Sequence, residues 1–229
     1  MGVESGATSL GVGKLSLNVK KKTVSKNQRN QKLLPPSTIT ELPRSNWTIE
    51  DSEALYRIEG WGQPYFSINA AGDVTVSPKG ERGGSLDLYE LVKSLKLRNL
   101  GLPLLIRFSD ILEDRIERLN ACFAKAIARY NYPGVYQGVF PVKCNQQRHL
   151  IEDLVRFGKP HQFGLEAGSK PELMIALALL DTEGSLLICN GYKDREYIET
   201  AMLAQRLGQT PILVLEQIEE VDLVIEVSR

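Results

Sequence analysis

The chain has 229 residues, of which 42% are hydrophobic, so it is long enough to bury a sizeable core in one or two domains. Its 28 Lys and Arg residues balance 28 Asp and Glu residues, and this neutrality gives no support for a nucleic-acid-binding protein. It contains no run of about 18 apolar residues, and its N-terminus lacks the apolar core of a secretory signal, so we expect neither a membrane span nor export.

The cysteines indicate a reducing compartment. Cys122, Cys144 and Cys189 are odd in number and widely spaced, and they form no CxxC pair and no cluster with metal-ligand spacing. We therefore predict reduced thiols in a cytoplasmic protein, with no metal site among the visible residues.

Residues 1–45 differ in composition from the rest of the chain. They contain eight Lys or Arg residues and only two acidic residues, which leaves the remainder with a net charge of −6. A segment this polar cannot bury enough apolar area to offset its ordering entropy, so we expect a disordered basic leader. Its basic run could contact nucleic acid or an acidic lipid, but a solvated tail is the interpretation that we favour.

Residues 46–109 predict a small N-terminal β/α region. A short capped helix is expected within 46–58, and two strands are expected at 65–69 and 74–77, joined by a hairpin turn. A helix is then expected at 86–95, and the last element of the region is a short apolar strand at 103–108.

Residues 110–229 alternate between strand and helix. A helix at 111–130, with Ser109 and Asp110 as N-caps, has apolar positions at helical spacing. Strands are expected to end at Lys143 and to span 162–165, 186–189 and 211–215. Helices are expected at 147–157, 171–180, 194–207 and up to the chain end. Such alternation means parallel strands with covering helices.

Two architectures fit these four βα units, a doubly wound sheet and the first half of a (β/α)8 barrel, for which a whole barrel needs roughly 250 residues. In a barrel, functional residues lie at the carboxyl ends of the strands, where Lys143, Glu166 and Asn190 fall. Half a barrel would leave strand edges unpaired and an apolar interior open. We therefore expect the chain to be a fragment of a longer protein.

Lys143 closes an apolar run that begins at residue 136. Desolvation disfavours a charged amine, and this suits a lysine that attacks a carbonyl and holds it as a Schiff base. A strand-end lysine that simply reaches solvent is the alternative. Glu166, one strand later, could orient that amine or stabilise its protonated form, or it could merely cap the next helix.

These residues resemble a known family. Residues 139–146 (VFPVKCNQ) are similar to the pyridoxal-phosphate lysine motif of the barrel-type ornithine, diaminopimelate and arginine decarboxylases. Four further stretches narrow the resemblance to the biosynthetic arginine decarboxylase branch: residues 61–69, 86–92, 102–108 and 164–170. The resemblance as a whole covers about residues 46–229. The basic leader resembles the variable N-terminal extension of some of these enzymes.

The resemblance implies that Lys143 carries pyridoxal phosphate covalently and that the enzyme converts L-arginine to agmatine and CO2 through a Schiff base, a step of putrescine and spermidine biosynthesis. It implies a supporting, cofactor-binding role for Glu166 beside Lys143, and the strand topology adds Asn190 at the same end as a further candidate cofactor-binding residue. It also implies Mg²⁺ and a homo-oligomer whose active sites are shared between subunits.

The resemblance places several parts beyond Arg229: the phosphate loop, the partner of the pyridine nitrogen, the arginine-binding residues and a C-terminal β-domain. That domain packs on residues 46–109 and supplies a cysteine that acts as the proton donor. We therefore expect the 229-residue chain alone to bind the cofactor weakly and to be inactive.

Three alternatives remain at this point. The chain could belong to a non-catalytic pyridoxal-phosphate-binding or regulatory protein of the same barrel fold, to an ornithine or diaminopimelate decarboxylase, or to a Schiff-base aldolase without that cofactor. We interpret His149 as a helix-surface residue rather than a ring-stacking one, and His161 as an ordinary residue. Strand alternation places Cys144 on the side opposite Lys143.

Overall fold

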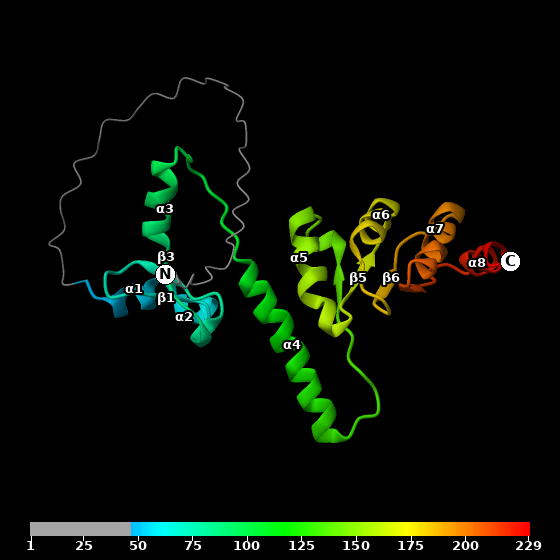
Figure 1. Ribbon diagram of the computed structural model, residues 1–229, viewed down its shortest axis with the longest axis horizontal. Helices are drawn as coiled ribbons and strands as arrows, with labels where there is room; N and C mark the ends of the chain where they lie inside the picture. Colours follow the sequence, from blue (N-terminus) through cyan, green and yellow to red (C-terminus); the bar gives the residue numbers. More distant parts are fainter. Residues whose placement is uncertain (1–46) are drawn as a thin grey trace, which may run out of the picture. The chain divides into compact units, whose positions relative to one another are not determined.

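The computed structural model describes residues 47–229, and the expected leader lies outside them. Contacts divide the chain into two compact units, with the boundary between residues 109 and 110, and each unit is described by itself (Figure 1). Within the described residues, no helix combines the length and the apolar character that a membrane crossing needs.

The first unit begins with two short helices, α1 (Ile49–Tyr56) and α2 (Ile58–Gly62). Thr48 and Asp51 form a capping box, in which each side chain accepts the backbone N–H of the other, at 3.2 Å and 2.9 Å. α1 ends where Arg57 adopts a left-handed conformation with φ of 51°. The predicted capped helix is confirmed, although the left-handed residue splits its end into a second helix.

A three-stranded antiparallel sheet follows, in the order β1-β2-β3, with β1 at Phe66–Ile68, β2 at Val74–Val76 and β3 at Leu86–Asp87. The turn between β1 and β2 is held by Asn69, whose side-chain oxygen accepts the backbone N–H groups of Ala71 and Asp73 at 2.9 Å. The predicted hairpin is confirmed. A 3-10 turn, η1 (Gly80–Arg82), lies between β2 and β3.

The third helix, α3 (Leu88–Leu97), starts two residues later than its apolar pattern predicts. Leu86 and Asp87 pair with β2 instead. The Asp87 carboxylate then caps the helix by accepting the N–H groups of Tyr89 and Glu90 at 2.8 Å and 3.0 Å.

The expected strand at 103–108 is wrong. These residues form no ladder with any strand that the structure describes. Leu105 is 65% exposed, so the apolar run that predicted a buried strand is not buried against described residues. An apolar run specifies a strand only when a second strand lies beside it, and local sequence does not contain that partner.

The second unit is an α/β fold with a parallel sheet, as predicted. After the long helix α4 (Ser109–Tyr130), four parallel strands pair in chain order, β4-β5-β6-β7. Their bounds are β4 Val139–Pro141, β5 Gly164–Ala167, β6 Leu186–Cys189 and β7 Thr210–Leu213. The helices are α5 Arg148–Gly158, α6 Lys170–Leu179, α7 Arg195–Arg206 and α8 Glu219–Val227, and a 3-10 turn, η3 (Lys159–His161), precedes β5.

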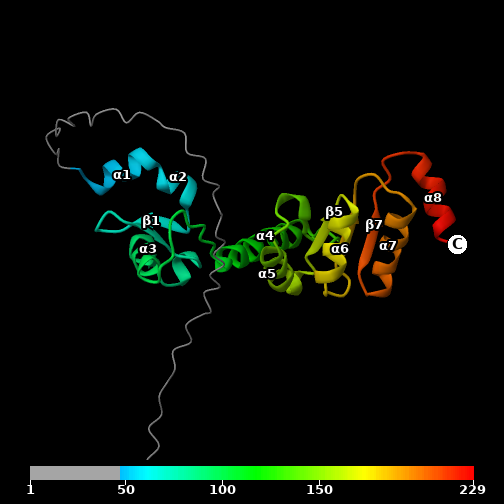
Figure 2. The ribbon, with the colours of Figure 1, turned by 90° about the horizontal axis from the view of Figure 1, so that it is seen from above.

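One core joins this sheet to its helices. Leu165 and Ala167 of β5 and Leu187 and Cys189 of β6 are all at most 1% exposed, and they cluster with apolar residues of α5, α6 and α7, which lie in a row beside the strands (Figures 1 and 2). Each fully buried leucine of this kind contributes about 1.5–3 kcal/mol. Because successive strand residues point to opposite faces, Glu166 lies on the face turned away from the helices.

Candidate active site

Lys143 lies just beyond β4 rather than at its end. The strand stops at Pro141, and residues 142–144 form a 3-10 turn, η2 (Val142–Cys144), anchored by the completely buried Val142. The Lys143 side chain is 63% exposed among the described residues. The expected burial of this amine is therefore wrong here: the turn lifts it out of the core and leaves it accessible.

Glu166 lies inside β5, not after a strand ending at residue 165. It is 7% exposed, and in the sheet it stands between Pro141 of β4 and Ile188 of β6. One carboxylate oxygen, Oε1, is 3.6 Å from Lys143 Nζ, which is an ion-pair contact. The alternative role as a helix cap is wrong, because Ser169 Oγ accepts the first-turn N–H of α6 instead.

Asn190 completes the cluster from the next strand. It follows β6 directly, and its backbone N–H donates to the carbonyl of Ala167 at 2.8 Å. Its side-chain Nδ2 donates to Glu166 Oε1 at 3.1 Å. The structure thus brings Lys143, Glu166 and Asn190 together at the carboxyl ends of neighbouring parallel strands.

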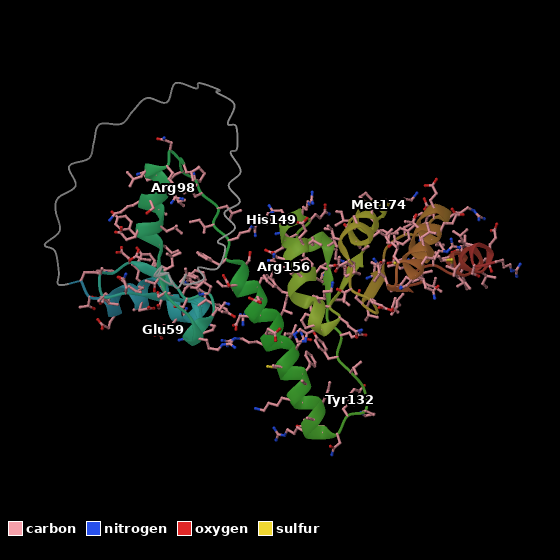
Figure 3. All side chains as sticks on the ribbon, viewed as in Figure 1. Glu59, Arg98, Tyr132, His149, Arg156 and Met174 are labelled. Atoms are coloured by element: carbon pink, nitrogen blue, oxygen red, sulfur yellow. The ribbon has the colours of Figure 1, made fainter. Side chains whose placement is uncertain are left out.

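Among the described residues, neither histidine forms a hydrogen bond or an ion pair with this cluster. His149, in the first turn of α5 (Figure 3), is half-buried, and its Nε2 is buried with no hydrogen-bond partner among the described residues, so it is not a simple helix-surface residue. His161 contacts Glu117 Oε1 at 3.0 Å. Cys144 is exposed in the 3-10 turn, where the strand alternation used to orient it does not apply.

Sequence reasoning missed Glu172. This α6 residue is 8% exposed; its Oε2 accepts the Gly168 N–H at 2.7 Å, and its Oε1 accepts Gln146 Nε2 at 3.3 Å. It therefore ties the loop after β5 to the segment that follows Lys143. An acid in a first helical turn predicts only a dipole interaction, and nothing in the sequence signals the distant partner.

Sequence reasoning also missed a buried ion pair between the loop after β6 and the start of α8. The side chain of Lys193 is 0% exposed and that of Glu220 is 3% exposed, with Lys193 Nζ 3.3 Å from Glu220 Oε2. Burial opposes ionisation of Glu220, but hydrogen bonds from the backbone N–H groups of Glu216 and Lys193 and from the Lys193 ammonium outweigh it, so the pKa of Glu220 is lowered.

Cys189 is expected to be chemically inert. It is fully buried, and this burial raises the pKa of its thiol to about 11, so it stays protonated at neutral pH. We predict that iodoacetamide leaves Cys189 unmodified in the folded protein and alkylates it after denaturation, as measured by peptide mass spectrometry. Fast native-state alkylation at neutral pH would contradict this assignment.

Among residues 47–229, no group of three or more His, Cys, Asp or Glu side chains could hold a metal ion. The candidate site is thus built from an amine, a carboxylate and an amide.

Comparison with known proteins identifies the family of this chain. The family described as pyridoxal-dependent decarboxylase, pyridoxal binding domain, matches residues 113–229, just over half of the chain. The chain belongs to this family.

Several members are similar over much more of the chain. The biosynthetic arginine decarboxylase of Nostoc sp. strain PCC 7120 is 81% identical over 228 residues, which cover 100% of this chain and 33% of the relative. That of Thermosynechococcus vestitus is 77% identical over 191 residues, covering 83% of this chain and 30% of the relative. The chain thus spans about a third of the length of the curated relatives that it matches.

A solved structure gives the same relationship. The crystal structure of the biosynthetic arginine decarboxylase from Campylobacter jejuni matches 76% of this chain with a TM-score of 0.69 and 34% identity, and the match covers 29% of that structure's chain.

The residues present fit a pyridoxal cofactor of the kind that this decarboxylase family uses. Pyridoxal phosphate carries an aldehyde, with which an accessible primary amine condenses. Lys143 offers such an amine, and the Glu166 carboxylate lies within ion-pair distance of it.

Proposed function

We propose that this chain is the N-terminal part of an enzyme that decarboxylates L-arginine to agmatine and CO2, a step of polyamine biosynthesis, with pyridoxal phosphate bound covalently to Lys143. The observation that carries the proposal is the 81% identity to the Nostoc arginine decarboxylase along the whole chain. The cluster of Lys143, Glu166 and Asn190 supplies the chemistry.

We infer that the second unit is the first half of a (β/α)8 barrel. Four parallel strands pair in chain order, without the change of direction that a doubly wound sheet contains, and their helices share one core on one face. On the other face, Glu166, Ile188 and Ile212 stand side by side in the register, and Ile212 is 42% exposed. In a closed barrel this face is the interior. Residues 46–109 would pack with a C-terminal β-domain.

Each residue of the cluster has a distinct task. Lys143 Nζ would hold the cofactor covalently through its aldehyde and, once the substrate amine has displaced it, would be a free amine able to hold or move a proton. Glu166 Oε1 stabilises the proton on that amine, and Asn190 holds the carboxylate in orientation through the bond to Oε1. The bound cofactor supplies the electron sink that accepts the electron pair left when CO2 departs.

Whether this chain can supply the cofactor-binding lysine of an arginine decarboxylase is tested in a chimera in which it replaces the matching third of the Nostoc relative. The chimera is incubated with L-arginine, L-ornithine or meso-diaminopimelate, and CO2 and the amine product are measured. We expect agmatine from arginine as the main product. Bound cofactor without agmatine formation would instead assign a non-catalytic protein.

Four expectations stay predictions, three from the family resemblance and one, the location, from the cysteines. They are the requirement for Mg²⁺, a homo-oligomer with shared active sites, a cytoplasmic location and the inactivity of the 229-residue chain alone.

A further inference from the structure

The side chain of Lys193 is 0% exposed, which is unusual for a lysine. Its ammonium donates to the carbonyl of Gly191 and lies 3.3 Å and 3.5 Å from the two oxygens of Glu220, while its backbone N–H donates to Glu220 Oε1 at 3.0 Å. The second carboxylate oxygen accepts the N–H of Glu216 at 2.9 Å. The Lys193 ammonium therefore has the Gly191 carbonyl and the Glu220 carboxylate as its partners among the described residues.

This pair joins the loops that follow two neighbouring strands. Lys193 lies in the loop between β6 and α7, and Glu220 is the second residue of α8, after β7. A second contact runs in parallel, from the Gly191 N–H to Glu216 Oε1 at 2.8 Å. The two contacts fix one loop against the other.

The first of these loops also carries Asn190, and its backbone leaves little freedom of movement. Gly191 has φ of +78°, and a Cβ atom at this position would lie 2.2 Å from the carbonyl oxygen of Gly168 in the loop after β5. Tyr197 adds a hydroxyl that donates to the carbonyl of Ala167 at 2.9 Å. Asn190 is thus held between the Lys193 network on one side and Glu166 on the other.

A buried ion pair is an inefficient way to stabilise a fold, because desolvation offsets most of its attraction and apolar residues of similar volume often do as well. A role in fixing geometry accounts better for a charged pair at this place. The pair holds the segments after β6 and β7 in one arrangement. The segment after β6 also carries Asn190, which donates to the Glu166 carboxylate that is ion-paired with Lys143.

We propose that Lys193 and Glu220 are positioning residues of the decarboxylase, which hold Asn190 so that its amide orients Glu166 toward the cofactor lysine. This proposal rests on the proposed function. It predicts that Lys193 acts through Asn190, and therefore that the effects of substitutions at the two positions are not independent.

The test is a double-mutant cycle in the chimera, with Lys193→Met, Asn190→Ala and both together. Readouts are kcat, KM and the pH at which the visible absorption of the bound cofactor changes. Lys193→Met should lower kcat about 10- to 100-fold with little change in KM, since small displacements at a reacting centre have effects of this size. In the Asn190→Ala background it should lower kcat by no more than about twofold, because sites that act through one contact are not additive.

Equal losses of kcat in both backgrounds, with unchanged absorption, would overturn the proposal and leave Lys193 a purely structural residue. If Lys193→Met does not fold, Glu220→Gln, which keeps one oxygen acceptor for the backbone N–H of either Lys193 or Glu216, gives the same cycle. The matched control is Lys159→Met, which removes an exposed lysine paired with Asp181 at 3.2 Å and should leave kcat unchanged.

Failure of the proposed function is seen in the unsubstituted chimera, before any substitution is compared. If the chimera decarboxylates another amino acid, the cycle is measured with that substrate. If it decarboxylates none, the absorption of the bound cofactor reports the coupling between Lys193 and Asn190 by itself.

Discussion

Lys143→Ala in the chimera is expected to lower decarboxylation by more than about 10³-fold, because it removes the nucleophile to which the cofactor is attached. The substituted side chain is 63% exposed among the described residues and forms an ion pair with Glu166, so its removal should leave the chimera folded. CO2 release, cofactor absorption and the thermal midpoint are measured on the same preparation.

Lys159→Ala is the matched control for this substitution. Lys159 is also exposed and ion-paired, but it precedes β5 and so lies at the opposite ends of the strands. It should retain full activity. A Lys143→Ala protein that keeps substantial turnover, or one that loses activity only because it has unfolded, would remove the support for Lys143 as the attachment site.

Glu166→Gln is expected to lower kcat about 10²-fold, within the range that a positioned acid or base contributes. The substitution keeps the size of the side chain and an oxygen that can accept from Asn190 Nδ2, but it removes the charge 3.6 Å from Lys143 Nζ. The fold should therefore survive, while the protonated amine of Lys143 loses its counter-ion. Pre-steady-state kinetics and the pH dependence of kcat measure the effect.

Glu152→Gln serves as the comparison, because it removes a carboxylate from an ion pair with Arg148 on the outer surface of α5. Its kcat should match that of the unmodified chimera. If Glu166→Gln and Glu152→Gln behave alike, Glu166 has no part in the chemistry.

The order of elements in the second unit could be predicted from sequence because the information is local. Apolar residues at helical spacing identify α4, and Ser169 and Asp194 cap α6 and α7 with their own side chains. The parallel arrangement then follows from alternation alone. The chain order of the strands and the shared helix face could not be read in this way, because two architectures fit the same alternation.

Errors arose where a distant partner decides the outcome. Residues 103–108 have an apolar pattern but no described strand beside them, and Leu86 leaves its predicted helix because β2 pairs with it. The exposure of Lys143 depends on a 3-10 turn that its apolar neighbours do not signal.

The candidate site divides in the same way. Its three residues lie near or just beyond the carboxyl ends of neighbouring strands, so topology brings them together, and sequence identified all three as candidates. Glu172 and the pair of Lys193 with Glu220 are defined by contacts across 26 and 27 residues, for which one sequence holds no signal.

The central claim is that the amine of Lys143 holds the cofactor, and reductive trapping tests it most directly. The chimera is loaded with pyridoxal phosphate, reduced with borohydride and digested, and the modified peptide is sequenced by mass spectrometry. We expect a phosphopyridoxyl group on Lys143 and on no other residue at comparable yield. A label on Lys170, Lys193 or a lysine outside this chain, with Lys143 unmodified, would contradict it.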